Sequence, residues 1–354
     1  MTVPAPRLSV LMPVYNGLPR LWEAAESVLR QTYSEFEFLV VDDGSTDGSS
    51  AACDDLAARD GRVRVLRHPK GENRGIVASL ALGLASARGE LVARMDADDR
   101  AYPERFARQV AYLDAHPEVA LVGSAVHVRG RDGSVVTRVP ATSPALIRWK
   151  LRFGVTFTHP TVTMRRRAVE AAGGYTAAAP HNEDHDLWLR MARQHDLANL
   201  PVPLLFFDTE GTTNVSTVHA GLQRETTIRL VQRAMSELVG EVERGVATDL
   251  HDSAYGRPLS DRPDARLEDR IEAAVRLLSD LSDAACRRRP ADAPAIRADA
   301  ALKMDALAWK LRASGWGRGA AVWACARWAP RLCALSTTRR IVTRFASAQP
   351  VDTP

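Results

Sequence analysis

Residues 36–47 read Phe-Glu-Phe-Leu-Val-Val-Asp-Asp-Gly-Ser-Thr-Asp, a mostly apolar run that stops abruptly in acidic and turn-forming residues. The same arrangement returns at residues 91–99, where Leu-Val-Ala-Arg-Met is followed at once by Asp-Ala-Asp-Asp. A third apolar run occupies residues 8–14. Such runs are typical of strands that are buried on both faces of a parallel sheet. We therefore expect two strands that each end in a carboxylate cluster.

Stretches with helical periodicity separate these strands, and the alternation predicts an α/β fold with a mostly parallel, Rossmann-like sheet flanked by helices. A Gly-Arg-Asp-Gly tetrapeptide at residues 130–133 predicts a hairpin over 126–139. The expected helices cover residues 20–31, 73–87, 103–116 and 184–195, and the further strands cover 62–66 and 119–124.

The C-terminal part of the chain reads as helical, so we expect two domains, residues 1–220 and 221–354. Trp309, Trp316 and Trp323 recur every seven residues among lysines and arginines. Such a segment suits peripheral contact with an anionic membrane. The alternative is a helical extension that packs on itself, on the first domain or on another copy. Nucleic acid is not an expected partner.

Composition places the chain among soluble globular proteins, with 45% hydrophobic and 25% charged residues. Its four cysteines lack C-x-x-C spacing, so neither a zinc site nor a disulfide framework is indicated. The N-terminus does not resemble a signal peptide, and no apolar run is long enough to span a membrane. We expect a cytoplasmic protein, with peripheral contact at the inner face of the cell membrane through the C-terminal segment.

Asp96, Asp98 and Asp99 bring three carboxylates to one strand end, where they repel one another unless a cation compensates. Mg²⁺ or Mn²⁺ suits such oxygen ligands and also binds phosphate. Asp42 and Asp43 end a second strand and could accept hydrogen bonds from a nucleoside in the crevice beyond the sheet. The alternative interpretation treats both clusters as turns that cap the following helices.

Residues 182–190, Asn-Glu-Asp-His-Asp-Leu-Trp-Leu-Arg, predict an acidic helix start. Acids there are also favourable through the helix dipole, which is the structural alternative. A displacement at an anomeric carbon needs one carboxylate to take the acceptor's proton, and we assign Asp184 to that role. A glycosidase would need a pair of carboxylates and no nucleotide site.

Four strings then occur in order: Ser-Val-Leu-Met-Pro-Val-Tyr-Asn-Gly (9–17), Val-Val-Asp-Asp-Gly-Ser-Thr-Asp (40–47), Met-Asp-Ala-Asp-Asp (95–99) and Glu-Asp-His-Asp-Leu-Trp-Leu (183–189). Together they resemble the large family of inverting bacterial glycosyltransferases called family 2, over about residues 7–220. The resemblance implies the GT-A fold and a helical C-terminal extension. Residues 205–211 depart from the family pattern, because they lack the arginine and histidine that relatives commonly carry there.

The resemblance also implies roles for individual residues. Pro13 and Tyr15 would lie in the loop under the nucleoside, and Asp43 would recognise the base with Asp42 beside it. Asp96 would reach the ribose or diphosphate, and Asp98 would hold the metal with Asp99 close by. The remaining assignments are Asp184 as catalytic base, Glu183 on the acceptor side and His159 near the donor sugar.

The sequence thus predicts an inverting, metal-dependent glycosyltransferase that uses a UDP- or dTDP-linked sugar. The expected acceptor is a hydroxyl of a glycan or lipid-linked sugar in the synthesis of cell-surface polysaccharide or glycolipid. Two alternatives stay open: a nucleotidyltransferase acting on sugar phosphates, and a catalytically inactive glycan-binding scaffold. The first would more naturally carry a Gly-rich phosphate loop after the first strand, which residues 15–17, Tyr-Asn-Gly, do not provide.

Overall fold

The computed structural model describes residues 5–130, 132–208, 220–259, 265–313 and 318–333 of the 354-residue chain. The chain divides into two compact units, one of Met1–Arg148 and Val155–Gln223 and one of Trp149–Gly154 and Arg224–Pro354. The short segment Trp149–Gly154 therefore belongs to the second unit although its chain neighbours on both sides belong to the first.

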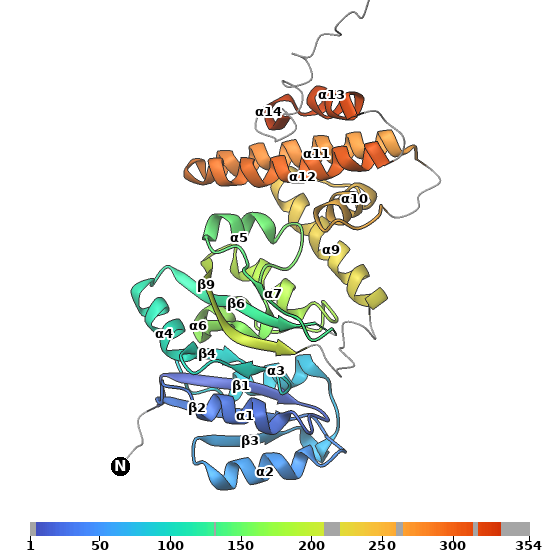
Figure 1. Cartoon of the computed structure of the whole chain (residues 1–354). Coiled ribbons are helices and arrows are strands. Elements are labelled where there is room, and N and C mark those ends of the chain that lie inside the picture. The colour runs from blue at the N-terminus through green and yellow to red at the C-terminus, as the bar shows by residue number, and fades with distance from the viewer. Residues whose placement is uncertain (1–4, 131, 209–219, 260–264, 314–317, 334–354) are drawn as a thin grey trace, which may run out of the picture. The chain divides into compact units, whose positions relative to one another are not determined.

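The first unit is built on a mixed sheet with the order β3-β2-β1-β4-β8-β6-β9-β5, and β7 pairs with β6 (Figure 1). The pairs β3-β2, β2-β1, β1-β4 and β6-β9 are parallel, whereas β8 is antiparallel to both β4 and β6. The strands are β1 Leu8–Val14, β2 Phe36–Asp42, β3 Val63–Arg67, β4 Leu91–Arg94, β5 Arg100–Ala101, β6 Val119–Arg129, β7 Val135–Arg138, β8 Thr163–Arg165 and β9 Asp196–Asp208.

This sheet confirms the predicted α/β class and the predicted hairpin, which β6 and β7 form. The helices around it are α1 Leu21–Leu29, α2 Ser49–Arg59, α3 Ile76–Ser86, α4 Arg105–Ala115, α5 Pro144–Lys150, α6 Arg166–Ala171 and α7 Glu183–Met191, with 3₁₀ turns η1 Pro69–Gly71 and η2 His159–Thr161. Helix α5 runs across the boundary between the units.

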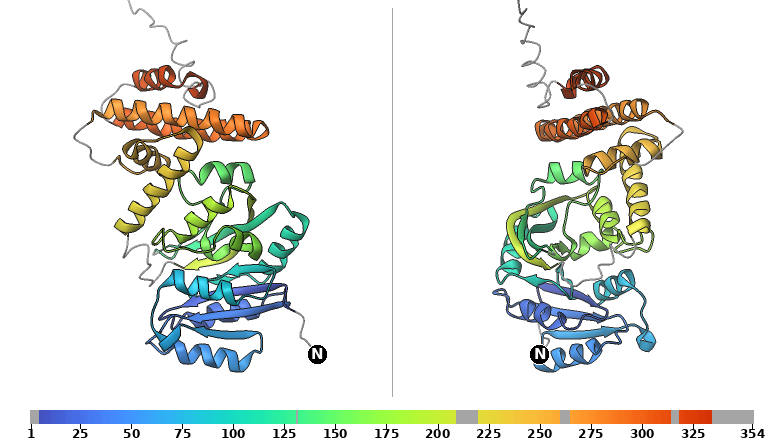
Figure 2. Two further views of the ribbon diagram at one scale, coloured as in Figure 1. Left: turned by 180° about the vertical axis from the view of Figure 1, so that it is seen from behind. Right: turned by 45° about the vertical axis from the view of Figure 1, so that its right-hand side comes forward.

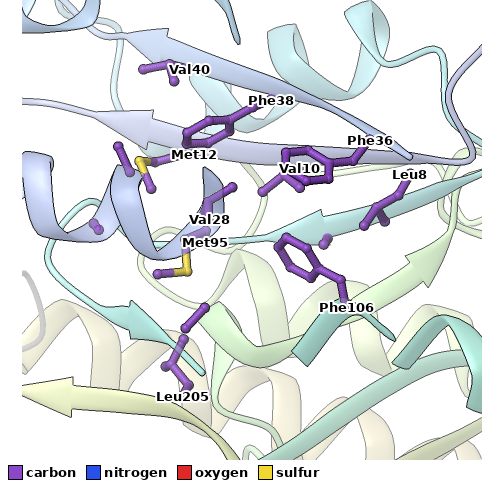
Figure 3. Close-up of a cluster of buried hydrophobic side chains, with 14 of the residues drawn as sticks. Leu8, Val10, Met12, Val28, Phe36, Phe38, Val40, Met95, Phe106 and Leu205 are labelled. Carbon is purple, nitrogen blue, oxygen red and sulfur yellow. The ribbon is translucent and has the colours of Figure 1, made fainter. Parts of the chain in front are cut away.

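The burial of the apolar runs explains why they form strands. Every residue of β1 and β2 is buried, as expected for strands covered on both faces. Helix α1 buries Leu21, Ala24, Ala25 and Val28, the spacing of one helical face. These side chains join Phe36, Phe38, Met12 and Phe106 in one apolar cluster, shown in Figure 3.

The second unit is helical. Helices α11 and α12 lie side by side (Figure 2), and Asp299 on α12 accepts hydrogen bonds from the Trp149 indole at 2.8 Å and from Lys303. Its helices are α9 Ala220–Val239, which begins in the first unit, α10 Arg244–Ala254, α11 Leu267–Arg288, α12 Ala293–Ala313, α13 Arg318–Trp328 and α14 Pro330–Cys333, with η3 Pro290–Asp292.

Two lysines of the C-terminal basic segment do not face outward as the membrane interpretation expected. Lys303 pairs with Asp299, and Lys310 donates to the carbonyl of Arg257, so both ammonium groups are engaged inside the second unit. Trp309 is 61% exposed, whereas Trp316 and the side chain of Trp323 lie outside the described residues. Within the described residues, no helix is both long and apolar enough to cross a membrane.

Candidate functional site

The loops that follow β1, β2 and β4 lie at the carboxyl-terminal ends of these parallel strands, which we call one edge of the sheet. Strand β1 lies between β2 and β4 and is parallel to both, with Val14 opposite Asp42 and Leu11 opposite Arg94. Because neighbouring strands are about 4.8 Å apart, the ends of β2 and β4 lie roughly 10 Å from each other. Both predicted carboxylate clusters therefore follow strands that end on the same side of the sheet, where open α/β sheets bind their ligands.

The loops after β1 and β2 are joined by hydrogen bonds. Asn16 Oδ1 accepts the N–H of Thr46 at 2.8 Å, and Ser49 Oγ accepts the N–H of Gly17 at 2.9 Å. Tyr15 is 54% exposed at the start of this pair of loops, so its ring is free to face a ligand. Pro13, which we expected in the loop, is instead buried inside β1.

The carboxylates of Asp42 and Asp43 are buried and bound by neighbouring protein groups. Asp42 accepts hydrogen bonds from Ser50 and from the N–H of Ser45, which lower its pKa although burial acts to raise it. Asp43 accepts the backbone N–H groups of Arg74 and Gly75 at 2.8 and 2.9 Å. Asp43 thus fixes the entry to α3, and its Oδ1 also lies 3.4 Å from Nε2 of the buried His68.

Part of the capping alternative is confirmed. Asp47 Oδ1 accepts the N–H of Ser49, the first residue of α2, at 2.9 Å. Its other oxygen accepts the N–H of Leu18 at 3.1 Å. Asp47 is therefore a structural residue that joins the start of α2 to the loop after β1.

We expect Gly44→Ala to destabilise the protein by about 2 kcal/mol or more, because its positive φ and its surroundings both exclude a side chain. Gly44 has φ +74°, and a Cβ there would lie 2.7 Å from both the Asn73 nitrogen and the Gly71 oxygen. Gly61→Ala is the matched control, since a Cβ at Gly61 meets nothing within 4 Å. Urea unfolding of both variants measures the difference, and equal midpoints would contradict this account of the turn.

Asp96, Asp98 and Asp99 form a compact group of oxygen ligands. One carboxylate oxygen of each lies within 4.8 Å of the others. Asp99 is only 1% exposed, and its Oδ2 has no hydrogen-bond partner. Burial and the charge of Asp96 raise the pKa of Asp98 to about 6. An orphaned buried oxygen and three crowded carboxylates fit a divalent cation such as Mg²⁺ or Mn²⁺.

Two arginines behind this group were not identified as site residues from the sequence. Arg94, the last residue of β4, is buried and forms an ion pair with Asp96. Arg105 is fully buried, and its Nη2 donates to the Arg94 carbonyl at 2.6 Å. The sequence does contain a signal, because a charged residue inside a buried strand needs a partner.

The start of α7 brings a second pair of acids to this region. Asp184 Oδ1 accepts the N–H of His185 at 2.7 Å, and Glu183 Oε2 is buried without a hydrogen-bond partner. Burial raises the pKa of Asp184, and burial together with Asp184 raises that of Glu183 to about 7. The charges of Arg94 and Asp96 act on both carboxyl groups. The helix therefore brings Glu183 and Asp184 close to the cluster that follows β4.

His159, in the 3₁₀ turn η2, has two aromatic neighbours that the sequence did not single out. Its Nε2 is 2.9 Å from the hydroxyl of Tyr175, and its ring meets that of Trp188 edge-on with centroids 5.6 Å apart. Burial and the charge of Arg94 lower the pKa of His159 well below its ordinary value. The imidazole of His159 is therefore neutral, and its contacts with Tyr175 and Trp188 fix its orientation.

The predicted site residues therefore fall into two groups. Asp96, Asp98, Asp99, Glu183 and Asp184 share one electrostatic environment centred on Arg94, which also acts on His159. In the part of the chain that the structure describes, Asp42 and Asp43 make their side-chain hydrogen bonds and ion pairs with other residues, which lie on α2, on β3 and in the loops after β2 and β3.

We expect the buried carboxyl of Glu183 to make stability depend on pH. The pKa of Glu183 is about 7 in the folded protein against an ordinary value of 4.5, so between these values the folded state holds the extra proton. Stability should fall as pH rises through this window. In metal-free buffer, Glu183→Gln should be more stable than wild type at pH 8 by on the order of 2 kcal/mol and no more stable at pH 4.5.

Denaturant unfolding at the two pH values measures this effect. Glu35→Gln is the control, because Glu35 is exposed and its replacement should leave the pH dependence as in the wild type. A stability difference between Glu183→Gln and wild type that is the same at both pH values would contradict the burial of an ionisable group at this position.

Comparison with known proteins points to one enzyme family. The family model for glycosyl transferase family 2 matches residues 9–173. The putative glycosyltransferase EpsE of Bacillus subtilis is 35% identical over 52% of this chain and 66% of its own length. The amylovoran biosynthesis glycosyltransferase AmsE of Erwinia amylovora is also 35% identical, over 56% of this chain and 74% of its own length.

A solved structure shares the fold. The crystal structure of S. aureus TarS 1-349 superimposes with a TM-score of 0.54 and 18% identity, over 85% of this chain and 86% of that one. TarS 1-349 has also been solved in complex with UDP-GlcNAc. This likeness confirms the predicted fold class.

Proposed function

The chain belongs to glycosyltransferase family 2, and from this membership we propose that it is a metal-dependent, inverting transferase acting on a nucleotide diphosphate sugar. We assign the activity to residues 1–220 and treat residues 221–354 as a helical extension. The observation that carries the proposal is the compact group of Asp96, Asp98 and Asp99, together with the effect of the Asp96 charge on the acids of α7.

Charge balance supports a cation at this place. Five carboxylates from two segments share the region with the guanidinium groups of Arg94 and Arg105. Asp98 and Asp99 would hold Mg²⁺ or Mn²⁺, and Asp96 would stay on the donor side. A cation held there would supply charge neutralisation for the departing diphosphate.

A residue at the start of α7 would provide the base for the reaction. Asp184 would accept the proton of the acceptor hydroxyl while the acceptor oxygen bonds to the anomeric carbon and the bond from that carbon to the diphosphate breaks. A carboxyl with a raised pKa is the stronger base, which suits this role. A single displacement from the side opposite the leaving group inverts the configuration at that carbon.

The proposed biological role is the synthesis of cell-surface polysaccharide or glycolipid, with a glycan or lipid-linked acceptor. AmsE carries the name of an amylovoran biosynthesis enzyme, and another relative, WbnJ of Escherichia coli, that of an O-antigen biosynthesis enzyme, 25% identical over 53% of this chain. We propose a UDP- or dTDP-linked donor. UDP-GlcNAc is the first donor to test, because TarS has been solved with it.

The test is a panel of nucleotide sugars scored for release of nucleoside diphosphate with Mn²⁺, with Mg²⁺ and with EDTA. Metal-dependent release of the diphosphate, with inverted configuration in the transferred sugar, is the expected result. Release of pyrophosphate from a nucleoside triphosphate and a sugar phosphate would point to a nucleotidyltransferase. No turnover of any donor, with glycan binding retained, would point to a scaffold.

A further inference from the structure

Strand β7 leaves one edge of the sheet open. It pairs antiparallel with the last residues of β6, and β9 pairs with the other side of the same residues of β6. Among the residues that the structure describes, no strand pairs with the outer side of β7. The N–H and C=O groups along such an edge can form a ladder of hydrogen bonds with a strand of another chain.

The side chains of this strand expose apolar surface. Val135 and Val136 are 52% and 50% exposed, and Val139, directly after the strand, is 57% exposed. Consecutive side chains of a strand point to opposite faces, so apolar surface is open on both faces of β7. Exposed apolar residues that are scattered singly need no explanation, but three within five residues form a patch that suits an interaction.

The two other edge strands of the sheet, β3 and β5, do not share this feature. Strand β3 carries Arg64 and Arg67, and both form ion pairs with acidic side chains. Charged residues are one of the means by which proteins protect a sheet edge from pairing. Strand β5 has two residues, Arg100–Ala101, and is too short to pair with much of another strand. The apolar, open edge is therefore a property of β7.

The hydrogen bonds of the β6–β7 hairpin show which backbone groups of β7 face outward. The N–H of Gly130 donates to the carbonyl of Ser134 at 2.8 Å, and the register from there along β7 has no shift. Pairs that exchange hydrogen bonds alternate with pairs that do not along an antiparallel ladder. The backbone groups of Val135 and Thr137 therefore point to the open edge. Val139 continues this alternation, because a residue before proline stays extended.

We propose that β7 pairs antiparallel with β7 of a second copy of the chain, about a twofold axis at Thr137. Val135 of each copy then lies opposite Val139 of the other, and Thr137 lies opposite its counterpart. The outward backbone groups meet one another, and Arg138 lies opposite Val136, so no like charges face directly. The joined sheet runs β9-β6-β7-β7-β6-β9, which closes both β7 edges and limits the association to two copies.

Sedimentation velocity of the full-length protein under reducing conditions measures the association. We expect a reversible dimer with a dissociation constant on the order of 10 to 100 µM, because two short strands form a small interface. The double variant Val135→Lys with Val139→Lys places lysines opposite each other twice and should weaken the dimer by about tenfold or more. Leu302→Lys is the matched control, since Leu302 is 63% exposed on α12 and its replacement should leave the dimer unchanged.

A disulfide tests the register without depending on the lysine variants. In Thr137→Cys the two cysteines face each other with Cα atoms about 5.5 Å apart, within the range of a disulfide. In the control Ser134→Cys the two cysteines are about 20 Å apart along the paired strands. Both variants also carry Cys333→Ser, and the three cysteines whose surroundings the structure describes are buried. Mild oxidation should give a covalent dimer of Thr137→Cys only.

Three results would overturn the proposal. They are a wild-type protein that stays monomeric up to about 200 µM, a dimer that the two lysines do not weaken, and Thr137→Cys that forms no more disulfide than Ser134→Cys. Circular dichroism confirms that each variant is folded. These measurements need no donor or acceptor, so the dimer stands or falls independently of the proposed transferase activity.

Discussion

Asp98→Asn should lower metal-dependent release of nucleoside diphosphate by about a thousandfold, equivalent to roughly 4 kcal/mol of transition-state stabilisation. Asp98 is one of three carboxylates whose oxygens lie within 4.8 Å of one another, and it is one of the two assigned to hold the cation. An amide keeps the size of the side chain and removes its charge. The loss should therefore appear in the metal dependence as well as in the rate.

The same substitution should leave the fold as stable as the wild type in metal-free buffer, or more stable. Burial and Asp96 disfavour the ionised form of Asp98. Replacing it by a neutral group removes that repulsion, so stability and activity should move in opposite directions. Asp55→Asn, on the exposed face of α2, is the control for loss of an acidic charge. A variant that loses stability and activity together would indicate a structural carboxylate.

Asp184→Asn should lower the rate of sugar transfer by about a thousandfold, because general base catalysis contributes roughly 10² to 10⁴ and the amide cannot accept the proton. Asp184 is partly buried at the start of α7, and the charges of Arg94 and Asp96 act on its carboxyl group. Binding of Mn²⁺ and of the donor should persist, since we assign those contacts to the loops after β2 and β4. Single-turnover transfer and equilibrium binding of the donor measure the two effects.

The neighbouring acid provides the comparison for Asp184. Glu183→Gln changes the adjacent residue in the same way and should cost less of the transfer rate, because Glu183 is assigned to support the acceptor side. If Asp184→Asn retained more than about a tenth of the wild-type rate while Glu183→Gln lost nearly all of it, the assignment of the base would pass to Glu183.

The sequence predicted the parallel part of the fold well because its strands are mostly apolar. The apolar run at residues 8–14 coincides with β1. The run at residues 36–41 coincides with β2 except that the strand extends one residue further, to Asp42. Such strands need no alternation and end where charged residues begin. The acidic ends of β2 and β4 were therefore also placed correctly at one edge of the sheet.

Strand β9 was not recognised as one long element. Residues 196–208 contain Pro201 and Pro203, which cannot donate to a ladder and normally mark loops or bulges. In the structure the pairing of β9 with β6 shifts register at this point, between the pairs Ser124 with Leu200 and Ala125 with Pro203. The irregularity accommodates the prolines, and a pattern based on regular strands misses it.

The sequence predicted the acidic residues of the candidate site but not the two arginines beside them, Arg94 and Arg105. Asp96, Asp98, Asp99 and Asp184 stand out because clustered carboxylates at element ends are visible in the sequence. Arg94 reads as a minor irregularity in an apolar strand, and its charge acts on the acids of α7, about ninety residues away along the chain. Contacts of that range are set by tertiary packing and have no local signal.

The most direct test of the central claim is a crystal structure of the full chain with Mn²⁺ and UDP-GlcNAc, analysed for anomalous scattering from manganese. We predict a manganese peak within coordination distance, about 2 Å, of an Asp98 oxygen. The carboxylate of Asp184 should lie on the side of the anomeric carbon opposite the diphosphate. A manganese peak away from residues 96–99, or an Asp184 carboxylate on the same side as the diphosphate, would contradict it.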